Sequence, residues 1–164
     1  NLQRCGVTNA VVSQHEGSNL CKRLKNMDIK FDKILLDAPC SGEGTIRLNP
    51  KTASMFNEGL IRKMSNIQKS LISSVFQILK VGGEMTYSTC THGPEENEEV
   101  VSYFLENFPV EIQEIKLPIK IRKGVSEWRE KKFHPDTIKS ARIYPQDNNT
   151  EGFFISKFKK LGEK

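Results

Sequence analysis

Short apolar segments alternate along this chain with longer stretches of helical pattern, and this alternation is the feature that most constrains the fold. The segment FDKILLDA is a continuous apolar run followed by a proline, as expected of a strand that is covered on both faces. A second segment, EMTYST, follows a pair of glycines. A short strand near the start and a closing strand near the end complete the set. The four predicted strands are Asn9–Gln14, Phe31–Ala38, Glu84–Thr89 and Gly152–Phe158.

Two helical patterns lie between these strands. Apolar residues recur at steps of three and four through about residues 57–80, which predicts a long amphipathic helix. Gly82 and Gly83 are expected to end it. A second helix is expected to start near Pro94, where four glutamates would complement the positive end of the helix dipole. Together, the strands and helices predict an α/β domain with a largely parallel sheet.

Size and composition indicate one ordinary globular domain. The chain has 164 residues, of which 37% are hydrophobic and 27% charged. No apolar run approaches the roughly 20 residues that a membrane span needs. The four cysteines form no CxxC pair and have no zinc-ligand spacing, which favours an intracellular protein with free thiols and no metal. Because the first residue is Asn, we expect a fragment or a processed chain. We also expect a monomer in the cytoplasm, with a nuclear or nucleolar location left open for a eukaryotic source.

The positive charge is concentrated in the second part of the chain. Residues 1–112 carry 12 Lys/Arg and 13 Asp/Glu, whereas residues 113–164 carry 13 and 7, which gives the net charge of +5. A basic region of this kind is compatible with RNA, although charge alone favours a solvated basic face. The less regular stretch 116–140 is interpreted as an insertion or long connection. Its Trp128 could stack on RNA or anchor the stretch to the domain.

Polar and reactive side chains follow three of the predicted strands. Glu16 comes after the first, Asp37 and Cys40 after the second, and Thr89 and Cys90 after the third. Parallel strands point their carboxyl ends at one edge of a sheet, and ligands bind open α/β sheets at that edge. We therefore expect these side chains to share one functional edge.

Several thiol chemistries do not fit the spacing at this edge. A phosphatase loop needs Cys and Arg six positions apart, but Cys40 and Arg47 are seven apart. The glycine-rich SGEGTIR lacks the lysine of a phosphate-binding loop. The histidines His15, His92 and His134 offer no recognisable frame for a Cys–His protease. A thiol–disulfide exchanger would normally carry CxxC.

One chemistry does need two separated thiols and an acid. Carbon 5 of cytosine is a poor nucleophile until a thiolate adds to carbon 6, after which carbon 5 can accept a methyl group from a sulfonium donor. An acid at ring nitrogen 3 stabilises the adduct. A second basic group then helps to remove the proton from carbon 5, so that the first thiol can leave.

The motifs around both cysteines resemble those of the Sun/Nop2-type RNA (cytosine-5)-methyltransferases. The resemblance runs nearly from end to end, and the two cysteine motifs together make it very specific. Further matches lie near the start and end of the chain. The matching segments are Asp37-Ala38-Pro39-Cys40-Ser41-Gly42, Tyr87-Ser88-Thr89-Cys90-Thr91, Pro94-Glu95-Glu96-Asn97-Glu98, Leu2 with Gly6, Val7 and Asn9, and Arg142 with Pro145 and Glu151-Gly152-Phe153-Phe154.

The resemblance implies roles for four residues. Cys90 would be the nucleophile that adds to the base, and Cys40 would assist release of the methylated RNA. Asp37 would lie between cofactor and cytosine and contact one or both. Glu16 stands where the family has an aspartate that contacts S-adenosylmethionine, and it is one methylene longer. The implied cofactor is S-adenosyl-L-methionine, and the implied partner is transfer or ribosomal RNA.

The family's glycine-rich cofactor loop, and the acid that holds the cofactor ribose, have no counterpart in this sequence. We therefore interpret residues 1–164 as part of a Rossmann-like class I methyltransferase catalytic domain without its first two strands, and we expect an exposed sheet edge. A non-catalytic RNA-binding or assembly module with the same fold is the alternative. DNA cytosine methylation would place the nucleophile in a Pro-Cys motif, here Pro39-Cys40, and the YSTC match argues against it.

Overall fold

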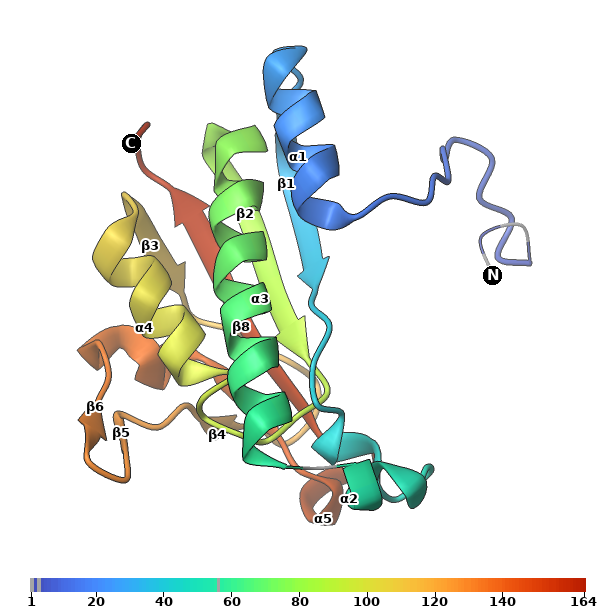
Figure 1. The fold of residues 1–164 in the computed structure, drawn as a ribbon, viewed down its shortest axis with the longest axis vertical. Helices are drawn as coiled ribbons and strands as arrows, with labels where there is room; N and C mark the ends of the chain where they lie inside the picture. The colour runs from blue at the N-terminus through green and yellow to red at the C-terminus, as the bar shows by residue number, and fades with distance from the viewer. Residues whose placement is uncertain (1, 3, 56) are drawn as a thin grey trace.

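The computed structural model describes every residue except 1, 3 and 56, and its centre is one mixed six-stranded sheet (Figure 1). Its strands follow the order β1-β2-β8-β7-β4, and β3 pairs with β8 beside this path. The strands are β1 (Phe31–Asp37), β2 (Leu79–Thr89), β3 (Val110–Gln113), β4 (Arg122–Lys123), β7 (Ala141–Ile143) and β8 (Phe153–Lys160). The strands predicted around residues 31–38, 84–89 and 152–158 are therefore confirmed, with small shifts in their ends.

The α/β fold class is confirmed, but the pairing within the sheet differs from the expectation of a largely parallel sheet. Among the described strands, β1 and β2 alone pair in parallel, and β8 is antiparallel to β2, β3 and β7. The closing strand returns between elements that precede it in the sequence, so its direction depends on long-range contacts. No local pattern in the sequence carries that information.

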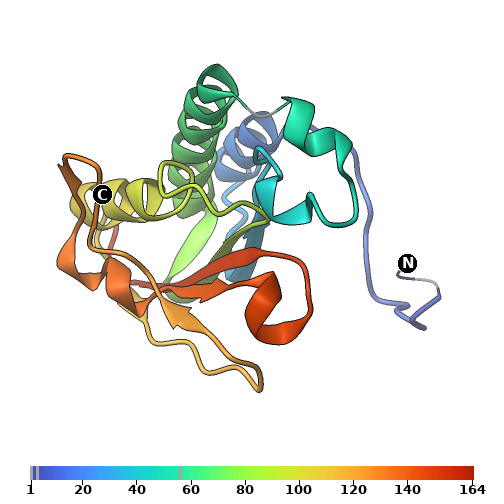
Figure 2. The ribbon, with the colours of Figure 1, turned by 90° about the horizontal axis from the view of Figure 1, so that it is seen from below.

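Three helices cover one face of this sheet, as Figures 1 and 2 show. They are α1 (Gly17–Asn26), α3 (Glu58–Ile78) and α4 (Glu98–Asn107). The prediction of a helix through residues 57–80 is confirmed. The shorter elements are η1 (Glu43–Thr45), α2 (Lys51–Met55), η2 (Pro135–Lys139), α5 (Pro145–Asn148) and the hairpin of β5 (Glu127–Trp128) with β6 (Lys131–Lys132). In the described part of the chain, no helix is long and apolar enough to cross a membrane.

Two predicted helix boundaries were wrong. β2 already begins at Leu79, so Gly82 and Gly83 lie inside a strand and do not end α3. They form an irregularity where the register with β1 shifts, and Gly82 has a φ of 79°. A Cβ on Gly83 would lie 2.9 Å from the carbonyl oxygen of Asp32. At the other boundary, a turn after Pro94 precedes α4, which begins only at Glu98.

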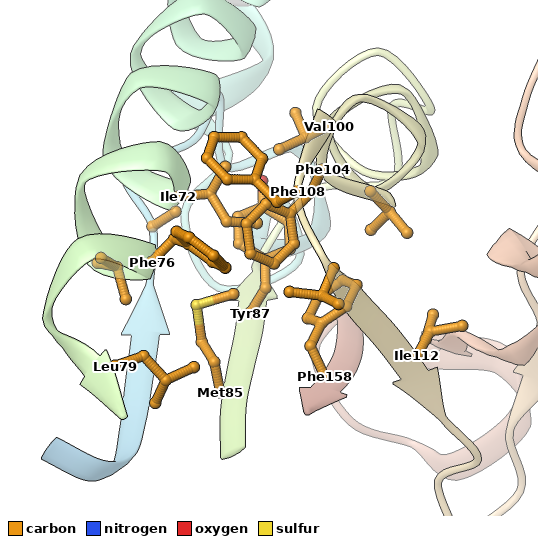
Figure 3. Close-up of a cluster of buried hydrophobic side chains, with 14 of the residues drawn as sticks. Ile72, Phe76, Leu79, Met85, Tyr87, Val100, Phe104, Phe108, Ile112 and Phe158 are labelled. Atoms are coloured by element: carbon orange, nitrogen blue, oxygen red, sulfur yellow. The ribbon is translucent and has the colours of Figure 1, made fainter. Parts of the chain in front are cut away.

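The core lies between the helices and β2 and β8 (Figure 3). Phe76 on α3 packs edge-on against Phe104 on α4, with ring centroids 6.2 Å apart. Phe104 in turn meets Phe158 of β8 at 5.0 Å. All three rings are fully buried. Complete burial of one such side chain contributes about 1.5–3 kcal/mol, so this cluster fixes α3 and α4 on the sheet.

The first strand of the sheet is open to solvent. No described strand pairs with the outer edge of β1, and Leu35 on its far face is 69% exposed. The expected exposed edge is therefore confirmed, whereas the coverage of both faces is not. The strand predicted at Asn9–Gln14 was also wrong, because this segment belongs to no strand and Val11 is 97% exposed. A strand needs a neighbour for its backbone groups, and no described strand pairs with this segment.

Candidate active site at the carboxyl ends of two strands

The parallel pair β1–β2 delivers both candidate cysteines to one edge of the sheet. Asp37 at the end of β1 is in register with Ser88 near the end of β2, so the loops that follow start side by side. Cys40 and Cys90 lie on these loops, and their Sγ atoms are 3.0 Å apart. Both side chains are partly exposed. The sequence correctly predicted that they meet, although their separate roles stay predictions.

Because the two sulfurs lie so close together, the pKa values of the two thiols move in opposite directions. A hydrogen bond from the Cys40 thiol lowers the pKa of Cys90 to about 7, against the opposing effects of burial and of the Asp37 charge. The same hydrogen bond, together with burial, raises the pKa of Cys40 far above its usual range. Cys90 is therefore the thiol of the pair that ionises first, and near neutral pH it is partly thiolate while Cys40 stays protonated. The thiolate is the nucleophilic form of cysteine.

Asp37 lies beside this pair with an exposed carboxylate. Its Oδ1 accepts a hydrogen bond of 2.8 Å from the hydroxyl of Ser88, which is itself buried. The negative charge of Asp37 is close enough to raise the pKa of Cys90. The structure thus groups an acid and two thiols at one point, as the sequence predicted, and the acid can contact a ligand.

Glu16 is placed differently from the prediction. Among the described residues no strand precedes it, and it is the N-cap of α1. Its Oε1 accepts from the backbone N–H of Ser18 at 3.0 Å, and its Oε2 accepts from that of Asn19 at 2.8 Å. These hydrogen bonds lower the pKa of the Glu16 carboxyl. The side chain therefore stabilises the helix start, and its contact with a cofactor stays a prediction.

Backbone contacts hold the two cysteine loops together. The N–H of Gly44 donates to the carbonyl oxygen of Cys90 at 2.9 Å, and the N–H of Gly152 donates to that of Gly44 at 2.9 Å. A Cβ on Gly44 would lie 2.6 Å from the carbonyl oxygen of Gly152 and 2.8 Å from that of Cys90. Because no side chain fits there, Gly44 is needed for the close approach of the loops.

A buried ion pair anchors the Cys90 loop from the other side. The Arg142 guanidinium donates two hydrogen bonds to the carboxylate of Glu98, one of them 2.6 Å long. It also donates to the carbonyl oxygen of His92 at 2.9 Å and to the hydroxyl of Tyr144 at 3.2 Å. The His92 ring stacks on Tyr144 with 4.9 Å between centroids. His92 is thus a packed residue, and burial lowers its pKa.

Sequence reasoning missed the burial of two glutamates near Pro94. Both Glu96 and Glu98 are fully buried and hydrogen-bonded, so they are structural parts of the site and not only partners of the helix dipole. Gln68 on α3, also fully buried, was missed as well. The only available signal was their place next to a cysteine motif or within an apolar helix face.

Trp128 lies away from the two thiols, on the β5–β6 hairpin. Its ring is 43% exposed, and its Nε1 donates to Glu95 Oε1 at 3.1 Å. It lines a groove of about 690 Å³ between the hairpin and α3. This hydrogen bond ties the hairpin to the loop before α4, which favours the anchoring interpretation. Whether residues 116–140 are an insertion stays a prediction.

Comparison with known proteins places this arrangement in a family. The model of the family described as 16S rRNA methyltransferase RsmB/F matches residues 1–159. A tRNA (cytosine(49)-C(5))-methyltransferase of Pyrococcus abyssi is 43% identical over 98% of this chain and 50% of its own length. A 28S rRNA (cytosine(4447)-C(5))-methyltransferase of Homo sapiens is 40% identical over 98% of this chain and 20% of its own.

Solved structures give the same result. A methyltransferase homolog from Pyrococcus horikoshii superposes with a TM-score of 0.81 at 33% identity, over 98% of this chain and 48% of that one. The structure of NSun6 from the same organism, solved with SFG, has a TM-score of 0.76 at 30% identity and covers 99% and 37%. The chain thus spans about half the length of the Pyrococcus abyssi relative and less of the human one. By sequence and by fold, this chain belongs to the 16S rRNA methyltransferase RsmB/F family.

Proposed function

We propose that the intact protein methylates carbon 5 of cytosine in RNA, with S-adenosyl-L-methionine as methyl donor. The observation that carries this proposal is the pair of thiols 3.0 Å apart beside an exposed aspartate, at the carboxyl ends of two parallel strands. Relatives named as cytosine-C5-methyltransferases of tRNA and of rRNA support the reaction and the class of substrate. A cytosine must leave its base stack to reach such a site.

The residues present fit one side of the cofactor. Asp37 offers a carboxylate at the open end of β1, where a cationic sulfonium or a hydroxyl group can be bound. A relative of the same fold was solved with SFG, an analogue of the cofactor, which supports its use. When bound, the cofactor supplies a methyl group on a positively charged sulfur. Glu16 would contribute through its charge, at the start of α1.

The Cys90 thiolate begins the proposed reaction. Its Sγ forms a bond to carbon 6 of the ring, and the electron pair of the 5,6 double bond becomes available at carbon 5. Carbon 5 would then take the methyl group, and the electron pair of the broken S–CH3 bond would stay on the sulfur of the donor. Asp37 in its protonated form would donate a hydrogen bond or proton to ring nitrogen 3 and so stabilise the negative charge that the thiolate brings to the ring. Because the pKa of Cys90 is lowered to about 7, the nucleophile is present at neutral pH.

Cys40 would then act in the release step. While Cys90 is a thiolate, the hydrogen bond between the sulfurs holds the proton on Cys40. Once Cys90 is bonded to carbon 6, that negative partner is gone and Cys40 can ionise more easily. Cys40 can then accept the proton of carbon 5. The electron pair of that C–H bond restores the 5,6 double bond, and Cys90 leaves as a thiolate.

The test compares Cys40→Ala with Cys90→Ala in the intact protein, incubated with S-adenosyl-L-methionine and total cellular RNA. We expect a protein–RNA band on a denaturing gel for Cys40→Ala and none for Cys90→Ala. Cys5→Ala removes an exposed thiol outside the site and is the matched control. Sequencing the trapped RNA would separate a transfer from a ribosomal substrate.

Other outcomes would change the proposal in defined ways. The reverse pattern of bands would exchange the roles of the two cysteines and favour the arrangement of the DNA enzymes. If neither variant traps RNA, and the wild type binds RNA without methylating it, the protein is the non-catalytic module.

A further inference from the structure

A fully buried side chain of α3 contacts the loop that carries Cys40. The Nε2 of Gln68 donates to the carbonyl oxygen of Pro39 at 2.8 Å and to Oε2 of Glu96 at 2.9 Å. The same Oε2 of Glu96 accepts from the backbone N–H of Ser41 at 3.0 Å. Gln68 and Glu96 are both 0% exposed. These three hydrogen bonds close a ring through the backbone of Cys40.

This ring fixes both peptide groups that flank Cys40. The carbonyl of Pro39 belongs to the peptide before Cys40, and the N–H of Ser41 belongs to the peptide after it. Holding both peptides fixes the two backbone dihedral angles of Cys40 and therefore the direction of its Cβ. The side chain of Gln68 thus acts on the Sγ position without touching the sulfur.

The ring also sets the Cys40 loop against the Cys90 loop. Glu96 lies six residues after Cys90, and the buried hydroxyl of Tyr87 donates to its carbonyl oxygen at 2.6 Å. Strand β2, which ends just before Cys90, therefore fixes Glu96 through Tyr87, and Glu96 with Gln68 fixes Cys40. A further bond of 3.0 Å between the hydroxyls of Ser41 and Thr91 joins the same two loops.

The arrangement is costly for the fold alone. Oε1 of Gln68 and Oε1 of Glu96 are buried, and neither has a hydrogen-bond partner among the described residues. Burying such a polar atom costs about 1–3 kcal/mol in proteins, and this cost offsets part of the stabilisation from the hydrogen bonds that Gln68 and Glu96 do make. A group kept at that cost calls for an explanation, and the geometry of Cys40 provides one.

We propose that Gln68 is a positioning residue that, through Glu96, holds Cys40 at hydrogen-bond distance from Cys90. The inference rests on the proposed function for its use, because the spacing sets which thiol is ionised and lets Cys40 reach the proton to be removed. The spacing itself can be measured without RNA or cofactor.

The test measures the pH dependence of Cys90 alkylation by iodoacetamide, with the modified peptide quantified by mass spectrometry. In the wild type, the midpoint should lie at about 7. Gln68→Met keeps the length of the side chain but has no N–H to donate. Without that hydrogen bond, the distance between the Sγ atoms of Cys40 and Cys90 should increase. The midpoint should then rise toward 9.0, the value for an isolated thiol. A full shift would lower the labelling rate at pH 7 about 50-fold, and Cys40→Ala sets this ceiling.

Two further variants distinguish a positioning role of Gln68 from a general loss of stability. Gln77→Met makes the same substitution nine positions further along the same helix, at a residue whose Oε1 accepts a hydrogen bond from Nζ of Lys25, and it should leave the midpoint unchanged. Glu96→Gln keeps an oxygen that can accept from Ser41 and Gln68. It removes a charge that raises the pKa of Cys90, so the midpoint should stay or fall. Opposite effects of Gln68→Met and Glu96→Gln are not expected from a loss of stability.

The outcomes decide the inference independently of the reaction. If Gln68→Met is folded and its midpoint equals that of Gln77→Met, the positioning role is refuted. Should Gln68→Met not fold, Gln68→Asn keeps the amide but is too short for both acceptors, and it must raise the midpoint for the inference to stand. In the intact protein, Gln68→Met should also accumulate the RNA adduct, as Cys40→Ala does. A raised midpoint without any RNA adduct in Cys40→Ala would refute the proposed function and leave the positioning role intact.

Discussion

Replacing Arg142 by methionine tests whether the buried ion pair with Glu98 supports both the fold and the site. The two side chains are 5% and 0% exposed, so the guanidinium and the carboxylate have each other and few other charged partners. Arg142→Met leaves Glu98 buried without its cation. It also frees the carbonyl oxygen of His92, two residues from Cys90.

The burial of the Arg142–Glu98 ion pair determines how much stability Arg142→Met should lose. Removing one partner of a buried ion pair typically costs 3–5 kcal/mol, because the remaining charge is left uncompensated. Domains of this size are stable by about 5–15 kcal/mol, so the loss is a large share of the total. With a slope near 2 kcal/mol per molar urea, a loss of about 4 kcal/mol lowers the urea midpoint by about 2 M. Circular dichroism of the helices reports the transition.

A double-mutant cycle isolates the pairwise part of this cost. Glu98→Gln keeps an oxygen that can accept from the N–H of Val125, as Oε1 of Glu98 does at 3.0 Å. In the Glu98→Gln variant, Arg142→Met leaves no buried carboxylate without a cation, so the stability that it loses should be smaller by about 2 kcal/mol. The reasoning is refuted if Arg142→Met costs less than about 1 kcal/mol, or if the two substitutions are additive.

Three further predictions concern single residues. Lys160 is fully buried, and its Nζ donates to the carbonyl oxygens of Phe76 and Leu79 at the end of α3, at 3.1 and 2.8 Å. Lys160→Met should lower the free energy of unfolding by about 2–3 kcal/mol and the melting temperature by roughly 5–10 °C. An unchanged melting temperature would contradict this prediction. Gly44→Ala should push the Cys90 carbonyl away and slow adduct formation at least about tenfold, whereas Gly162→Ala, with no atom within 4 Å of the added Cβ, should have no effect. Because the pKa of Cys90 is lowered to about 7, the single-turnover rate of adduct formation should rise from pH 6 to pH 8 and then level off; a flat profile would show that Cys90 is not the group that ionises.

The parts of the fold that follow local rules were predicted from the sequence. The period of the apolar residues predicted α3 almost to its ends, and two short segments predicted β1 and the second half of β2. The meeting of Cys40 and Cys90 followed as well, because the carboxyl ends of neighbouring parallel strands lie together. Each of these inferences needs only a pattern in one segment and a rule about one pairing.

The errors occur where distant segments decide the outcome. The apolar residues of Asn9–Gln14 looked like a strand, but a strand forms only beside a partner, and none is present there. The antiparallel direction of β8 depends on its contacts with β2, β3 and β7. The burial of Glu98 depends on Arg142, 44 positions away, and charged residues are exposed by default unless such a partner exists.

The distinction between local and distant contacts also applies to the site itself. The strands bring the thiols to the same edge, but the distance of 3.0 Å depends on bonds between loops, helix α3 and the turn before α4. All of the residues that make these bonds lie within this chain, and none lies on the open edge of β1. The lowered pKa of Cys90 should therefore be present without cofactor and without RNA. Binding of either would then meet a thiol pair that is already in place, because the fold itself supplies the free energy that organises the pair.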